Sequence, residues 1–119
     1  MTFGEFVKEK RQKLGITLRA FADELHIAPS YVSDIEKGKR NAPTQEILED
    51  MSRILQLTIE DKNTLYDLAA ESKNVIAKDI TQYVSDNKNV RIALRRAKEL
   101  NLGEEEWLKI IDEIINKKR

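Results

Sequence analysis

Apolar residues recur every three or four positions along most of the chain, the spacing that places side chains on one side of an α-helix. Two such sets open the chain: Phe3, Phe6, Val7 and Leu14, and then Leu18, Phe21, Ala22 and Leu25. Alternation of apolar and polar residues with β-branched side chains, the mark of a strand, is scarce. The pattern therefore predicts an all-α protein.

Polar and turn-forming residues between these sets predict where the helices begin and end. Thr17 suits an N-cap, Pro29 the first residue of a third helix, and Gly38 the position after its end. The fourth and fifth helices follow Thr44 and Thr58, and their predicted core residues are Ile47, Leu48, Met51, Ile54 and Leu55, then Leu65, Leu68 and Ala69.

The pattern starts again after about residue 73. Three further apolar sets are Ile76, Ile80, Tyr83 and Val84; Val90, Ala93, Leu94 and Ala97; and Trp107, Leu108, Ile111, Ile114 and Ile115. Glu104–Glu106 begin the last helix and Lys117–Arg119 end it, as the helix dipole favours. We therefore expect a five-helix domain over residues 1–73 and a small helical unit over residues 74–119.

Composition excludes several classes of site. With no cysteine and one histidine, the chain has no disulfide scaffold, thiolate metal site or multi-histidine metal site. No nucleophile–base pair or phosphate-binding loop is visible, so we expect neither an enzyme nor a cofactor. No apolar run approaches the roughly 18 residues of a membrane span, and the start does not resemble a signal peptide, which predicts a cytoplasmic protein with no membrane partner.

Charge is balanced overall but uneven locally. The chain has 21 basic and 21 acidic residues, which argues against a general nucleic-acid coat. Residues 43–73 carry 3 basic and 7 acidic side chains, whereas Arg91, Arg95, Arg96 and Lys98 form a basic cluster. This cluster is either a solvated helix face or a second contact with nucleic acid or with an acidic protein.

The predicted third helix has an unusual outer face. Ser30, Ser33, Asp34 and Lys37 share one side at helical spacing, and Val32 and Ile35 point the opposite way. Solvated faces usually carry long Glu and Lys side chains, whereas short polar side chains allow close approach to the floor of a DNA groove. By itself the stripe is consistent either with a helix that reads DNA or with a merely solvated helix face.

The segment from Ile16 to Leu25, the run from Ser30 to Arg40 and the pair Pro43-Thr44 together resemble the XRE/Cro family of helix-turn-helix regulators, which includes phage repressors. The resemblance covers about residues 3–70. It implies a five-helix lambda-repressor-like domain whose third helix enters the major groove of double-stranded DNA. It also implies transcription regulation, and repression in particular, in a bacterium or phage.

The resemblance implies a DNA-binding role for nine residues: Thr17, Arg19, Lys37, Lys39 and Arg40 at phosphates, and Ser30 and Asp34 at bases with Pro29 and Ser33 alongside. Because phosphates repel a carboxylate, Asp34 could instead orient an Arg or Lys. Arg11 and Glu36 match a family pair that forms a salt bridge between the first and third helices.

Three positions depart from the family pattern. Leu18 stands where Gln often meets a phosphate, so Arg19 is the candidate replacement for that contact. His26 occupies a turn position often held by Gly, and histidine tolerates a positive φ better than most residues. Ala28 replaces the usual Ser or Thr cap of the third helix.

Residues 74–119 are the candidate region for dimerisation, for an effector or for a protein partner. We expect a homodimer on a palindromic operator, because one reading helix alone gives little specificity. Two alternatives stay open: an antitoxin whose C-terminal helices hold a toxin, and a protein-interaction adaptor that has lost DNA binding.

Overall fold

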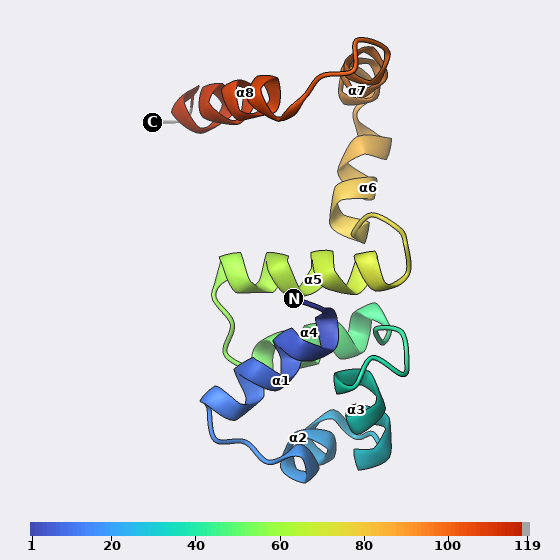
Figure 1. The fold of residues 1–119 in the computed structure, drawn as a ribbon, viewed down its shortest axis with the longest axis vertical. Helices are drawn as coiled ribbons and strands as arrows, with labels where there is room; N and C mark the ends of the chain where they lie inside the picture. The colour runs from blue at the N-terminus through green and yellow to red at the C-terminus, as the bar shows by residue number, and fades with distance from the viewer. Residues whose placement is uncertain (118–119) are drawn as a thin grey trace. The chain divides into compact units, whose positions relative to one another are not determined.

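A computed structural model describes residues 1–117, and within this range the fold is all-α, as predicted (Figure 1). The helices are α1 (Phe3–Lys13), α2 (Leu18–Leu25), α3 (Pro29–Glu36), α4 (Gln45–Ile54), α5 (Ile59–Ser72), α6 (Lys78–Asp86), α7 (Lys88–Glu99) and α8 (Glu104–Lys117). None of them is long and apolar enough to cross a membrane. Lys118 and Arg119, which were expected to end the last helix, lie outside the described residues.

The chain divides into two compact units, the first from Met1 to Lys78 and the second from Asp79 onward. The predicted boundary at residue 73 falls in the segment that connects α5 to α6. In that segment the Val75 N–H donates to the Ala70 carbonyl and Ala77 is buried. The segment therefore continues the first unit as far as α6.

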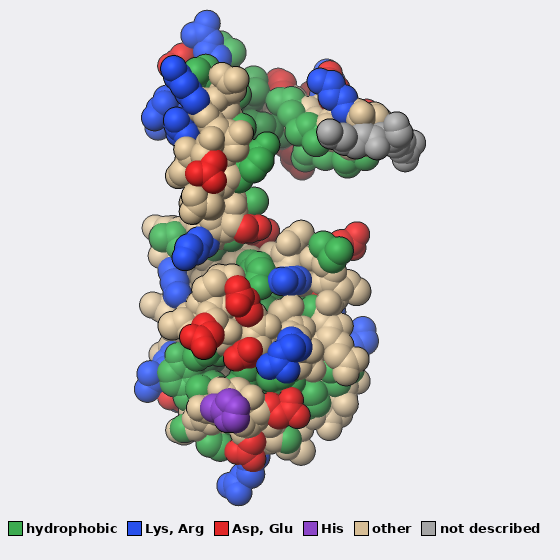
Figure 2. Space-filling view, turned by 180° about the vertical axis from the view of Figure 1, so that it is seen from behind, with side chains coloured by type: hydrophobic (Ala, Val, Ile, Leu, Met, Phe, Trp, Pro, Cys, Tyr) green, Lys and Arg blue, Asp and Glu red, His purple; other side chains and the backbone are tan. Residues whose placement is uncertain are grey.

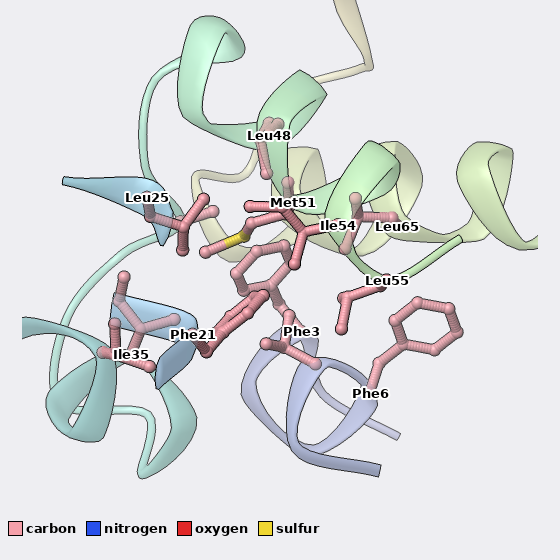
Figure 3. Packing of buried hydrophobic residues seen from close by; sticks show 14 of the residues in the cluster. Phe3, Phe6, Phe21, Leu25, Ile35, Leu48, Met51, Ile54, Leu55 and Leu65 are labelled. Atoms are coloured by element: carbon pink, nitrogen blue, oxygen red, sulfur yellow. The ribbon is translucent and has the colours of Figure 1, made fainter. Parts of the chain in front are cut away.

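The first unit encloses one hydrophobic core, to which all five of its complete helices contribute (Figure 3). Phe21, Met51 and Leu65 are among its fully buried side chains. Burying one such side chain stabilises a fold by about 1.5–3 kcal/mol. The helices that meet around this core are α1 with α3 and α5, α2 with α3 and α4, and α4 with α5.

One residue of the predicted core lies elsewhere. Leu14, expected on the apolar side of the first helix, is 43% exposed. It is the C-cap of α1, and Gly15 with a φ of +70° turns the chain directly after it. A residue at this position lies beyond the last turn that packs on the core, so the helical spacing no longer fixes its direction.

The second unit has the predicted helices but almost no interior. Within residues 79–117, Ala97 is the one buried apolar residue. Large apolar side chains are exposed on all three of its helices and at the C-cap of α7: Ile80, Tyr83, Ile92, Leu94, Leu100, Trp107, Leu108, Ile111, Ile114 and Ile115. Amphipathic helices with this much exposed apolar surface are typical of a unit that is completed by a partner.

Candidate nucleic-acid interface

Local sequence signals shape the turn between α2 and α3. The Thr17 hydroxyl accepts a hydrogen bond from the Ala20 N–H, at 3.1 Å, and so caps α2 as predicted. His26 ends α2 in the left-handed region, with a φ of +58°, which confirms that it is a turn residue. Pro29 begins α3, and Ala28 before it provides no side-chain cap. The start of α3 is therefore fixed by proline and by packing.

The two sides of α3 differ as the sequence predicts. Val32 and Ile35 are buried in the core, at 0% and 1% exposure. Ser30 and Lys37 are exposed, and Ser33 and Asp34 are partly exposed between them. Because the apolar side is locked into the core, the polar stripe points outward in a fixed register.

Asp34 and Tyr31 together hold Arg40 at the end of this stripe. The Arg40 Nε lies 3.6 Å from the Asp34 Oδ2, and the Arg40 guanidinium lies 4.9 Å from the centre of the Tyr31 ring. Sequence reasoning left an orienting role of Asp34 open but missed Tyr31. An aromatic residue nine positions before a cation carries no distinctive signal until the loop brings the two side chains together.

A buried ion pair fixes the C-terminal end of α3 to α1. Arg11 donates to both carboxylate oxygens of Glu36, at 2.8 and 2.9 Å, and to the Ile16 carbonyl at 2.8 Å. These hydrogen bonds to Glu36 raise the pKa of the Arg11 guanidinium further above its already high value. The predicted pair is thus confirmed, and it joins α1 to the last residue of α3.

Gly4 is a positioning residue that the sequence analysis missed. A Cβ atom at this position would lie 2.3 Å from the Ile35 carbonyl oxygen and 2.6 Å from that of Glu36. Only glycine lets α1 approach the end of α3 so closely. The available signal was a glycine inside a helix, where it costs about 0.5–1 kcal/mol relative to alanine and thus needs a reason.

The basic loop after α3 is anchored to the end of α5. The Ala42 N–H donates to the Ser72 hydroxyl at 3.3 Å, and the Lys73 ammonium donates to the Pro43 carbonyl at 3.4 Å. Ala42 and Pro43 are buried, whereas Lys39 and Arg40 are exposed. The loop therefore presents its two cations to solvent from a fixed base.

The segment that contains α2, the turn and α3 is similar to known proteins. Residues 7–62 match the helix-turn-helix family model. This range contains α2, the turn and α3 completely. Residues 7–62 therefore form a helix-turn-helix domain of the XRE type.

Several proteins that are similar to this chain are named as transcriptional regulators. The HTH-type transcriptional regulators SinR of Bacillus licheniformis and of Bacillus subtilis (strain 168) are each 29% identical over 89 residues, which cover 69% of this chain and 80% of the relative. The regulator DdrOP3 of Deinococcus deserti is 33% identical over 61 residues, 51% of this chain and 46% of that protein.

A solved structure of the SinR protein/SinI protein complex has a similar fold, with a TM-score of 0.52 at 21% identity. The match covers 98% of this chain and 98% of that one. At this level of identity the likeness shows the fold, and it confirms the predicted class of a helix-turn-helix domain followed by further helices.

In this chain the predicted DNA-binding residues lie on three elements. Ser30, Ser33, Asp34 and Lys37 share the outer face of α3, with Pro29 at its first position. Lys39 and Arg40 lie in the loop after α3, and Thr17 and Arg19 lie exposed at the start of α2. Contact of these residues with DNA stays a prediction.

Proposed function

We propose that the chain is a transcriptional regulator, a repressor in particular, that binds double-stranded DNA sequence-specifically and inserts α3 into the major groove. The observation that carries this proposal is the short polar stripe of α3, held outward by the burial of Val32 and Ile35. The names of the relatives support the regulatory role. Such a regulator acts in the compartment that holds the DNA, the cytoplasm of a bacterium.

Two kinds of contact divide the site. Ser30 donates to or accepts from a base edge, with Ser33 and Pro29 close to the groove floor. Phosphates are held by the cations Arg19, Lys37, Lys39 and Arg40 and by the Thr17 hydroxyl at the start of α2. The first group sets sequence preference, and the second sets register and affinity.

Ser30→Ala and Arg40→Ala separate these two groups. Ser30→Ala reduces the free energy of binding to the preferred sequence by about 1 kcal/mol or more, and it relaxes the base preference. Arg40→Ala weakens binding to all DNA sequences by a similar factor. It also reduces the magnitude of the slope of log K against log salt by about 1. Sequences selected from random duplex DNA supply the preferred site, and Arg53→Ala, which removes an exposed arginine paired with Asp50 at 3.3 Å, is the matched control.

Equal losses on preferred and random DNA for Ser30→Ala would remove Ser30 from base reading. An intact protein that selects no sequence at all would contradict the proposed function as a whole. It would then favour the adaptor that has lost DNA binding.

Asp34 acts on DNA through Arg40 in this proposal. The ion pair directs the guanidinium, while Tyr31 supports it from one side. Asp34→Asn then leaves base preference unchanged, and a double-mutant cycle with Arg40→Ala gives a coupling of about 0.5 kcal/mol or more. A shift in preference at a cytosine would instead assign Asp34 to base reading.

The second unit makes the protein a homodimer on a palindromic operator. Ile111, Ile114 and Ile115 expose 48%, 64% and 59% of their surfaces along one side of α8, and a second copy is the commonest way to cover such a side. Dimerisation places two α3 helices on half-sites about 10–10.5 bp apart or at multiples of this distance.

Sedimentation of the intact chain tests this assembly. The double substitution Ile111→Asp and Ile114→Asp produces monomers and weakens full-operator binding far more than half-site binding. Asn116→Asp adds a charge to another side of α8 and leaves the dimer intact. An intact chain that is monomeric at tens of micromolar contradicts the dimer.

A protein partner on the same helices is the second candidate. The exposed apolar sides of α6–α8 favour it, and the solved structure of similar fold is itself a complex with a second protein. Stoichiometric co-purification of a small protein from the native host, lost with Ile111→Asp and Ile114→Asp, supports this partner. A toxic partner would identify the chain as an antitoxin.

A further inference from the structure

Positive charge is concentrated on α7 to an extent that the rest of the chain does not share. The helix carries five basic residues and one acidic residue, a net charge of +4, in a chain whose net charge is zero. Figure 2 shows Lys and Arg side chains gathered over this helix, in the upper part of the view. The acidic residue, Glu99, pairs with Arg96 at 3.2 Å.

Four of the cations form one continuous row. Lys88, Arg91, Arg95 and Lys98 follow one another at intervals of three or four residues, which makes them neighbours along the helix surface. At a rise of 1.5 Å per residue the row is about 15 Å long. No acidic residue interrupts it.

Only one member of the row has a structural task within the unit. Arg91 donates to the carbonyls of Val84 and Ser85, and so caps the end of α6. Among residues 1–117, Lys88, Arg95 and Lys98 form no ion pair, and all three are exposed. Three charges are therefore available to a ligand.

The row also stays accessible when the apolar side of α7 is covered. Val90, Leu94 and Ala97 lie roughly a third of a turn around the helix from the row. A partner that packs on these residues leaves the cations at the edge of the interface or outside it. The row can therefore meet a ligand of its own while Val90, Leu94 and Ala97 are covered.

We propose that the row on α7 binds the phosphate backbone of DNA, as a second contact that does not read sequence and is separate from α3. One DNA strand carries a charge every 3.4 Å along the axis, so a row of about 15 Å faces about four phosphates. A regular line of like charges matches this uniform polyanion better than it matches the mixed surface of a folded protein.

The test uses the intact chain and a duplex that lacks any selected operator, so that it does not depend on base reading by α3. Binding is measured by fluorescence anisotropy between about 50 and 200 mM salt, the range over which phosphate contacts separate clearly. For the triple variant Lys88→Gln, Arg95→Gln and Lys98→Gln, the negative slope of log K against log salt becomes shallower by about 2–3. Arg95→Gln alone makes this slope shallower by about 1.

Arg96→Gln is the matched control, because it removes the same charge one residue further along. Its side chain lies on another side of α7 and is engaged with Glu99, so the slope stays at the wild-type value. Circular dichroism and sedimentation confirm that each variant keeps the helices and the assembly state of the wild type.

Three results would overturn the inference: a triple variant with the wild-type slope, an equal change of slope for Arg95→Gln and Arg96→Gln, or a wild-type chain that does not bind this duplex. A triple variant that instead loses self-association or an acidic protein partner assigns the row to protein binding and also overturns it. Failure of base reading by α3 is recognised separately, as a loss of preference for the selected operator with the salt slope unchanged.

Discussion

The two units of this protein have similar amphipathic helices but differ in how much of their apolar surface is buried. In the first unit the apolar sides of the helices meet, so that Phe21, Met51 and Leu65 are fully buried. In the second unit the apolar side of α8 is open, with Ile111 48% and Ile114 64% exposed. Amphipathic spacing thus states which side of a helix avoids water, but it does not state which molecule covers that side.

Polar interactions differ between the units in the same way. The Arg11–Glu36 pair is enclosed, with side-chain exposures of 9% and 4%, whereas the Arg96–Glu99 pair has exposures of 73% and 63%. An enclosed pair loses its hydration and depends on its partner, whereas an exposed pair is solvated with or without one. The first unit is therefore sensitive to single substitutions that the second unit tolerates.

Truncation of apolar side chains gives the sharpest contrast between the units. Phe21→Ala empties a site of 0% exposure and lowers the free energy of unfolding by about 3–5 kcal/mol. Ile114→Ala changes the free energy of unfolding of the monomer by less than about 0.5 kcal/mol and weakens self-association instead. Urea unfolding at low protein concentration measures the free energy of unfolding of both variants, and sedimentation measures self-association. Equal losses of unfolding free energy would mean that the second unit has a core of its own.

Removal of an arginine gives a contrast of similar size between the two units. Arg11→Ala leaves the Glu36 carboxylate buried without a partner and costs about 3–5 kcal/mol. Arg96→Ala breaks an exposed pair and costs less than about 1 kcal/mol. Thermal unfolding compares the two, and an unchanged melting temperature for Arg11→Ala would mean that the first unit does not depend on this pair.

Glycine substitution extends the comparison to backbone packing. Gly4→Ala forces α1 away from the end of α3 and costs about 1–3 kcal/mol, with weaker DNA binding because α3 is displaced. A Cβ at Gly103 would meet only the flexible Glu106 carboxylate, at 3.2 Å, so Gly103→Ala is close to neutral. Urea unfolding and DNA titration of the two variants check this difference. A stable, fully active Gly4→Ala protein would contradict the close approach of the helices.

The smallest expected effect concerns the start of α1. The hydrogen bond that the Thr2 N–H donates to the Glu5 carboxylate, together with the nearby Thr2 side chain, holds the pKa of the Glu5 carboxyl below its usual value. A lowered pKa in the folded state adds stability above the unfolded pKa, and this stability is lost as pH falls through the folded value. Glu5→Gln is therefore slightly less stable than wild type at pH 7 and equal to it in strong acid. Unfolding curves across this range provide the measurement.

Local sequence signals predicted most of the fold. Thr17, Pro29 and Gly38 mark the helix ends that the structure shows, and Val32 and Ile35 lie in the core as their spacing requires. These features depend on neighbours a few residues away, which is why the sequence alone contains them. The Arg11–Glu36 pair was also anticipated, through the resemblance to the XRE/Cro family.

The sequence by itself determined the helices, their apolar sides and the family of the first unit, because each rests on short-range spacing or on a recurring motif. Only the tertiary structure decided the approach of α1 to α3 at Gly4 and the placement of Arg40 between Asp34 and Tyr31. The physical reason is that such contacts join residues whose separation is set by how whole helices pack and where loops turn, and no local pattern encodes that distance.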